Sequence, residues 1–165
     1  MHAYHKLIDR FARTRVGSVM FLHVFYPIDK RLMRWTNGAL NTTIGTEFRD
    51  NAALLCCTGA KSGQRREIPL LVAPLDGKFV LIAAAGGQEK NPAWYFNLKA
   101  NPECSLLVRR RGEIACVAHE AEGDEREGAW AAANAQYSGY TIYQGRTERR
   151  IPVMILTPCA PKPSE

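Results

Sequence analysis

The stretch EIPLLVAPLDGKFVLIAAA, residues 67–85, contains two apolar runs that are joined by Asp76-Gly77. An Asp-Gly pair between apolar runs is a strong hairpin signal, because the tight turns that suit twisted strands need residues that tolerate positive φ. The stretch therefore predicts a β-hairpin, and the remaining segments are interpreted around it.

Four more apolar runs and two helical segments accompany this hairpin. The other predicted strands are AALLCCT at 52–58, CSLLVRR at 104–110, GEIACVAHEA at 112–121 and IPVMILTP at 151–158. Short helices are expected over 91–101 and 124–136, where a proline and acidic residues respectively suit the first turn. This order is not a βαβ pattern. We expect a mainly β fold with peripheral helices, of the α+β class, in which about six mostly antiparallel strands curl into a barrel.

The composition limits the kinds of partner. With 165 residues, of which 23% are charged and 46% hydrophobic, the chain suits one globular domain. Its net charge of +6 favours an acidic ligand, a nucleic acid or an anionic membrane surface. The basic residues are dispersed without interleaved aromatic residues, so we expect no nucleic-acid partner. The five cysteines include no C-x-x-C pair and form no cluster with the four histidines, so we expect neither a disulfide framework nor a metal site.

The N-terminal part is expected to form a separate unit. Residues 1–35 are expected to be helical, within an arm over 1–40 that precedes a barrel domain over 41–158 and a flexible tail over 159–165. The apolar run 16–26 is too short to span a bilayer, which takes roughly 20 residues. Two alternatives stay open: the arm packs on the domain core, or it contacts an anionic membrane surface peripherally. The expected location is the cytoplasm, in the second case at the inner face of the membrane.

The segment TGAKSGQRR, residues 58–66, has the composition of an anion-binding turn. Its glycine spacing is not that of a P-loop, and a strand pattern rather than a helix follows it. The side chains of Lys61 and Ser62 can converge with the turn amides on an anion, and Arg65 and Arg66 add fixed positive charge. The alternative is a solvated basic turn without a ligand.

Two further segments combine glycines with aromatic residues. In GGQEKNPAWYFNLKANP, residues 86–102, the glycines leave room for a flat ligand, and the following helix directs free amide groups toward the same space. Trp94 and Tyr95 are interpreted either as core anchors or as groups that stack on a ring. In YSGYTIYQGR the spacing places three phenols on nearly one helical face, as a pocket wall or as a half-buried seam. These phenols belong to Tyr137, Tyr140 and Tyr143.

Together these segments resemble the deazaflavin-dependent nitroreductase family, which is a group of split β-barrel oxidoreductases that use coenzyme F420. The matching stretches are TGAKSGQRREIPL, AAAGGQEKNPAWYFNLKANP and YSGYTIYQGRTERRIPVMIL, in that order. The resemblance implies a split β-barrel that binds the reduced deazaflavin in a groove. It also implies that the anion at the basic turn is the cofactor's phosphate and its oligoglutamate tail.

The resemblance assigns roles to particular residues. Lys61, Ser62 and Arg66 are expected at the phosphate end, and Pro69 and Leu70 along the ring or ribityl chain. The implied cofactor-binding set, with Arg65 added for its charge, is Lys61, Ser62, Arg65, Arg66, Pro69, Leu70, Ala84, Gly86, Gly87, Asn91, Trp94 and Tyr95. The tyrosines that shape the substrate side, and the expected catalytic residues, are Tyr137, Tyr140 and Tyr143. The chain departs from the family pattern at Ala60, where a basic residue is common, and at Ala84, where a serine is common.

The implied activity is hydride transfer from reduced F420 to an electron-poor small molecule such as a quinone, an enone or a nitroarene. Tyr137 or Tyr140 is the candidate proton donor. Two alternatives remain: a reductase that uses FMN, and a non-catalytic split-barrel module that binds a fatty acid or another amphiphile. Whether the protein is a monomer or a homodimer stays open at this point.

Overall fold

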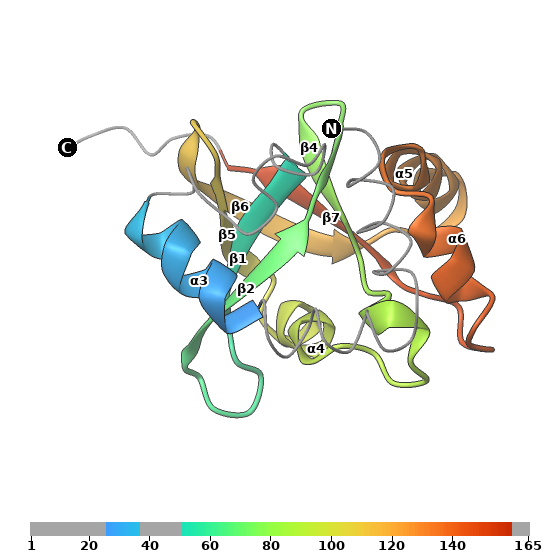
Figure 1. Cartoon of the computed structure of the whole chain (residues 1–165), viewed down its shortest axis with the longest axis horizontal. Coiled ribbons are helices and arrows are strands. Elements are labelled where there is room, and N and C mark those ends of the chain that lie inside the picture. The colour runs from blue at the N-terminus through green and yellow to red at the C-terminus, as the bar shows by residue number, and fades with distance from the viewer. Residues whose placement is uncertain (1–25, 37–50, 160–165) are drawn as a thin grey trace.

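The computed structural model describes residues 26–36 and 51–159, which form a curled antiparallel sheet with helices around it (Figure 1). The strands are β1 (Ala52–Thr58), β2 (Arg65–Leu71), β3 (Ala73–Leu75), β4 (Lys78–Ile82), β5 (Glu103–Val108), β6 (Gly112–Glu120) and β7 (Val153–Pro158). The helices are α3 (Tyr26–Trp35), the 3-10 turn η3 (Ala85–Gly87), α4 (Ala93–Ala100), α5 (Gly123–Gln136) and α6 (Gly139–Gln144).

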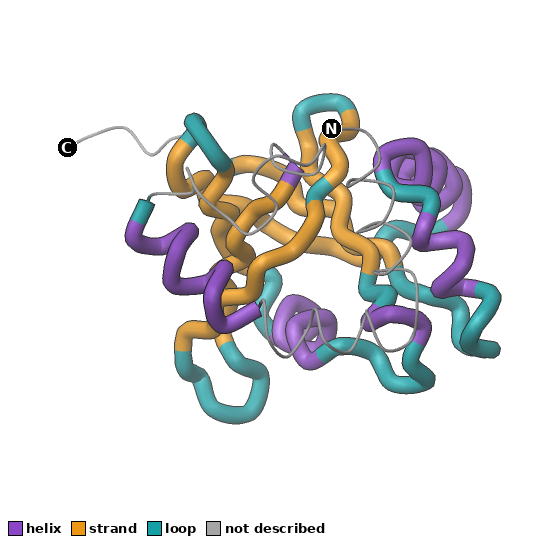
Figure 2. Tube along the Cα trace, in the orientation of Figure 1, coloured by secondary structure: helices purple, strands orange, loops and turns teal. Residues whose placement is uncertain are grey.

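The sheet has the strand order β2-β1-β5-β6-β7-β4-β3, and its paired strands are all antiparallel. Its two outermost strands, β2 and β3, are consecutive in the chain and are separated only by Val72. One continuous segment therefore reaches from one edge of the sheet to the other, which requires the sheet to curl. Figure 2 shows the strands wrapped in this way. The expected mainly β barrel with peripheral helices is confirmed as a seven-stranded half-barrel.

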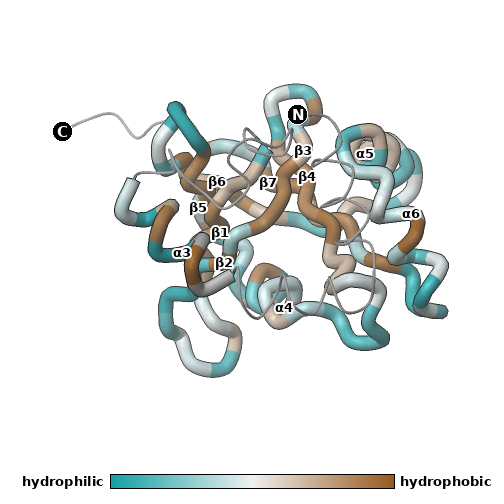
Figure 3. Tube along the Cα trace, viewed as in Figure 1, coloured by the Kyte–Doolittle hydropathy of each residue, from teal (hydrophilic) through white to brown (hydrophobic). Residues whose placement is uncertain are grey.

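Strands β1, β4 and β7 are buried on both faces over most of their length, which explains their continuous apolar runs. Neighbouring residues such as Leu54 and Leu55, or Ile155 and Leu156, belong to different core clusters. The inner face packs around α4, one outer face lies under α5 and α6, and the other outer face lies under Met33 of α3. Figure 3 shows the resulting hydrophobic colouring along the strands.

Most predicted elements are confirmed, with one strand divided. The Asp76-Gly77 turn has positive φ at both residues, 50° and 76°, as the hairpin requires. The run 67–75 was expected to be a single strand, but Val72 breaks it, because the Val72 amide donates to the Asn51 carbonyl (2.8 Å) where the chain changes partner strands. The expected helix over 1–35 is observed for Tyr26–Trp35, and the rest of it lies outside the described residues, as does most of the tail.

The strand pairing brings four segments to one end of the half-barrel. The register pairs Thr58 with Arg65, Cys57 with Cys104, and Ile82 with Val153. The turn 59–64, the segment 83–92, helix α4 and the chain entering β7 therefore all meet at this end. Figure 1 shows the turn, α4 and η3 along its lower side. The segments that carry the predicted site residues are thus neighbours in space.

Candidate active site

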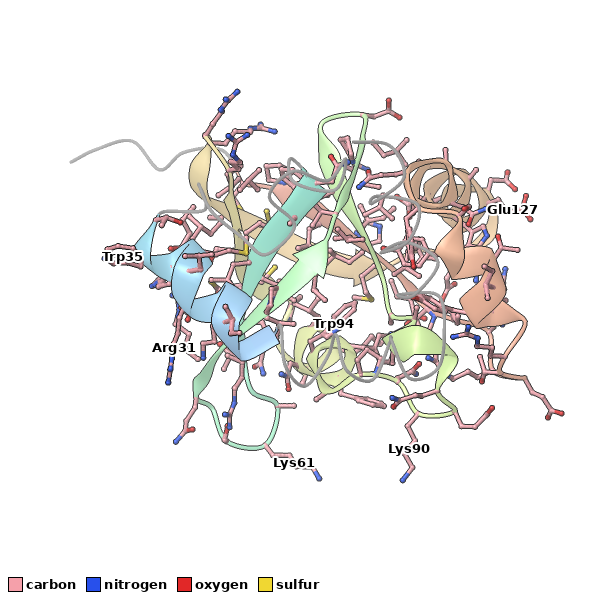
Figure 4. All side chains as sticks on the ribbon, in the orientation of Figure 1. Arg31, Trp35, Lys61, Lys90, Trp94 and Glu127 are labelled. Atoms are coloured by element: carbon pink, nitrogen blue, oxygen red, sulfur yellow. The ribbon has the colours of Figure 1, made fainter. Side chains whose placement is uncertain are left out.

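The turn between β1 and β2 presents positive charge at this end. The Gly59 amide donates to the Gln64 carbonyl and the Gly63 amide to the Gly59 carbonyl, each at 2.8 Å, and Gly63 has a φ of 64°. Arg66 donates to the Ser62 hydroxyl (3.2 Å). Lys61 is exposed and has no hydrogen-bond or ion-pair partner among residues 26–36 and 51–159; Figure 4 shows its side chain extending away from the turn.

This turn is fixed to α4. The Ala60 amide donates to the Asn97 side-chain oxygen (3.0 Å), and the Asn101 amide group donates to the Thr58 carbonyl (3.4 Å). The Asn97 amide group also contacts the Cys57 sulfur (3.8 Å). Helix α4 therefore holds the basic turn in place at the end of the inner core.

The segment that follows β4 has an unusual backbone. Ala85, Gly86 and Gly87 all have positive φ, at 47°, 67° and 82°. This conformation is unfavourable for a residue with a Cβ, so Ala85 is strained, and such strain clusters at functional sites. A Cβ on Gly87 would lie 2.7 Å from the Tyr143 carbonyl and 2.9 Å from Arg146 Cβ. Gly87 is therefore required for the close approach of α6.

Two arginines hold this strained segment from the chain that enters β7. The Arg149 guanidinium donates to the carbonyls of Ala83 (3.1 Å), Ala84 (2.9 Å) and Gln88 (2.8 Å), and to the Asn91 side-chain oxygen. Arg146 donates to the Gly86 carbonyl (3.2 Å). The main influence on the pKa of Arg149 is burial, which lowers it, but the guanidinium stays protonated at neutral pH. The conformation of residues 83–91 thus depends on side chains from outside it.

The three tyrosines form one buried cluster beside this segment. Each is at most 9% exposed, and their rings pack edge-to-face or tilted against one another with centroids 5.2–6.4 Å apart. The hydroxyls of Tyr137 and Tyr143 are hydrogen-bonded at 3.0 Å. Burial raises the pKa of Tyr140 well above its usual range, so this phenol keeps its proton at neutral pH. The cluster shares its core with Ala84, which connects it to the strained segment.

The structure separates some of the predicted residues. Arg65 points to the α3 side, where it forms ion pairs with Glu67 (3.6 Å) and Glu113 (2.7 Å), while Arg66 lies on the inner face. Strand alternation likewise places Pro69 and Leu70 on opposite faces of β2, and Leu70 is the one beside the inner core.

The aromatic residues of α4 differ in environment. Trp94 is buried in the inner core, and half-buried Tyr95 packs against that core and donates to Glu120 (2.9 Å). Of the two interpretations given to Trp94, the core anchor is the one that its burial supports. The cofactor roles of the separated residues and of α4 remain predictions.

A family model described as F420H(2)-dependent quinone reductase matches residues 29–158, which is more than half of the chain. The chain belongs to this family. The protein is therefore an oxidoreductase, and its cofactor is reduced coenzyme F420.

Individual relatives agree with the family assignment. An F420H(2)-dependent quinone reductase of Mycobacterium tuberculosis H37Rv is 36% identical over 154 residues, which is 91% of this chain and 97% of the relative. A solved F420-H2 dependent reductase is 42% identical over 64% of this chain and 93% of its own, with a TM-score of 0.60. A structure titled as a domain-swapped dimer is 38% identical over 78% of this chain and 96% of its own, with a TM-score of 0.62.

These matches confirm the expected split-barrel fold and F420, and they give no support to the FMN alternative. The family name specifies a quinone, which is one of the three expected acceptor classes, and it does not mention a nitroarene. The residues present fit an anionic cofactor. Because Gly59 has no side chain, Ser62 and Arg66 can approach its backbone in the basic turn. Lys61 in the same turn has no carboxylate partner within the described chain. Lys61, Ser62 and Arg66 could therefore hold its phosphate and tail.

Sequence reasoning missed Arg149, Arg146 and Asn97. The stretch GRTERRIP was included in the matching segment, but nothing in its spacing distinguishes Arg149 from the adjacent Arg150. The groups that Arg149 contacts lie 58 to 66 positions earlier in the chain. Only the strand pairing that joins β4 to β7 brings them together.

Proposed function

We propose that this protein binds reduced F420 across the end of the half-barrel and reduces a quinone beside the tyrosine cluster. The observation that carries the proposal is the contact between the strained segment 83–91 and α6, since it places the glycine segment and the phenols at one location. The basic turn lies at the same barrel end, on the other side of α4.

Each part of this end has a distinct task in the proposal. Lys61, Ser62 and Arg66 bind the phosphate and the tail carboxylates, because charge-assisted hydrogen bonds to arginine and lysine are strong. The segment around Ala84 and Gly86, held rigid by Arg149, supports the ring. When bound, the reduced deazaflavin supplies a hydride.

Reduction of a quinone to a hydroquinone also requires a proton that the hydride does not carry. Tyr137 and Tyr143 share a hydrogen bond, so one hydroxyl can donate a proton onward while the other stabilises it. Tyr140 remains protonated because of its burial and is the second candidate donor. Replacement of the tyrosine that donates the proton by phenylalanine is expected to lower kcat about a hundredfold while F420 affinity stays unchanged.

The experiment is an anaerobic mixture of the full chain, reduced F420 and a soluble naphthoquinone. Oxidised F420 and hydroquinone are expected to form in equal amounts, and only when the protein is present. A parallel titration with reduced FMN is expected to show no saturable binding. Binding of F420 without turnover of any quinone would overturn the proposed acceptor, whereas failure to bind F420 would overturn the site.

Two finer proposals concern association. We infer that the protein forms a homodimer, since a relative 38% identical to it is a domain-swapped dimer; a monomeric mass by light scattering would refute this.

We also infer peripheral contact with anionic lipid through α3, where the side chains of Trp35 and Ile28 are 85% and 51% exposed beside Arg31. Sedimentation with anionic vesicles should fall for Trp35→Ser. Within the described chain, no helix is long and apolar enough to cross a membrane.

A further inference from the structure

A cavity of about 340 Å³ lies between α5, α6 and the chain that enters β7. Its volume falls within the range of small-molecule pockets. None of the predicted cofactor or catalytic residues lines it, and Figure 1 shows α5 and α6 across the molecule from α3 and the basic turn. The residues that line it are Arg126, Trp130, Thr141, Gln144 and Arg150.

Two guanidinium groups share this cavity, and neither forms an ion pair with a residue that the structure describes. Arg150 is exposed and has no hydrogen bond or ion pair to any residue in 26–36 or 51–159. The pKa of Arg126 is lowered, first by burial and then by repulsion from Arg150; Glu120 and Glu127 act in the opposite direction, each less strongly than Arg150. Two like charges at close range cost free energy, which an anion bound between them would offset.

The cavity wall also includes the indole of Trp130. The Arg126 guanidinium lies 5.4 Å from the ring centroid of half-buried Trp130 and donates to the Ile151 carbonyl (2.9 Å), so its position is fixed. The Gln144 side chain is occupied by backbone partners, because it donates to the Arg149 carbonyl and accepts from the Ile151 amide. The polar groups left to a ligand are therefore mainly the two cations.

We propose that this cavity binds a small aromatic carboxylate, whose anionic group lies between Arg126 and Arg150 and whose ring packs against Trp130. A carboxylate matches the forked geometry of guanidinium groups, and an aromatic body makes use of the indole surface that an inorganic anion would leave uncovered. This inference does not depend on the assignment of the quinone or of the cofactor residues.

The test uses the full chain and benzoate, with inorganic phosphate at matched ionic strength as the comparison ligand. Binding is followed by the NMR signal of the Trp130 indole N–H, assigned through Trp130→Phe. Saturable benzoate binding that shifts this signal is expected, and Arg150→Gln should weaken it about tenfold. Arg150 has no hydrogen bond or ion pair among the described residues, so this variant is expected to fold normally.

Arg31→Gln is the matched control, because it removes the same charge from an exposed position on α3. Its benzoate affinity should equal that of the unmodified chain, and Glu127→Gln should bind benzoate somewhat more tightly. Equal weakening by Arg150→Gln and Arg31→Gln would overturn the proposal, since only net charge would then matter. Binding of phosphate without benzoate, or no shift of the Trp130 signal, would overturn it as well.

Discussion

Replacement of Arg149 by methionine tests how the strained segment is held. The substitution keeps a long apolar side chain and removes every hydrogen bond from the guanidinium to residues 83–91. Gln88 is exposed and Asn91 half-buried, so water can replace the bond at those two acceptors. The cost therefore arises mainly at the two buried carbonyls, those of Ala83 and Ala84.

The magnitude follows from these two groups. The Ala84 carbonyl also accepts from the Gly87 amide (2.9 Å), so it keeps one partner. The Ala83 carbonyl has no other partner among the described residues, and an unsatisfied buried acceptor costs about 1–3 kcal/mol. With a smaller contribution from Ala84, we expect the free energy of unfolding to fall by about 2–4 kcal/mol. The free energy of unfolding of Arg149→Lys should lie between those of the unmodified chain and Arg149→Met, since one ammonium group cannot reach all the acceptors.

The assay is urea unfolding of the full chain, followed by circular dichroism, together with titration of reduced F420. The adjacent Arg150→Met variant is the control, because it removes the same charge without removing a hydrogen bond or ion pair within the described chain. We expect Arg149→Met to lose both stability and F420 affinity, and Arg150→Met to lose neither. Equal behaviour of the two variants would refute the role given to Arg149.

Four other predictions concern separate parts of the structure. Lys61→Ala and Arg66→Ala should each weaken F420 binding by about 1–3 kcal/mol in a salt-dependent manner, and unchanged affinity would place the phosphate elsewhere. Gly139→Ala should lower the melting temperature, because its Cβ would lie 2.3 Å from the Tyr137 ring, whereas Gly128→Ala, with open space around it, should raise stability by about 0.5–1 kcal/mol. Exposed Cys159 should react with a thiol reagent at pH 8 in the native protein, and Cys104 should not, since burial raises its pKa to about 12. The raised pKa of buried Tyr140 means that the unfolded chain loses that proton first, so stability should fall above about pH 10, and less so in Tyr140→Phe.

The sheet could be predicted because its strands are short, apolar and separated by turn residues. Asp76-Gly77 and Gly112 marked hairpins that the structure contains. The division at Val72 could not be predicted, because residues 68–75 form an unbroken apolar run in sequence. The change of partner strand there depends on the closure of the whole sheet.

The candidate site was predicted in part. Glycines, basic residues and tyrosines are recognisable by residue type, so Gly86, Lys61 and Tyr140 could be selected from the sequence. Which face of a strand each residue occupies depends on pairing, and this is why Arg65 was grouped with Arg66 although the two side chains point apart. The role of Gly87 in the approach of α6 depends on a contact between segments more than fifty residues apart.

Amide hydrogen exchange of the full chain with and without reduced F420 tests the central claim most directly. If the cofactor lies across the end of the half-barrel, the turn 59–66 and the segment 83–91 should gain protection together at saturating cofactor, while the opposite turn at 109–112 should not change. Protection of neither segment at a cofactor concentration that saturates binding would show that F420 is held somewhere else.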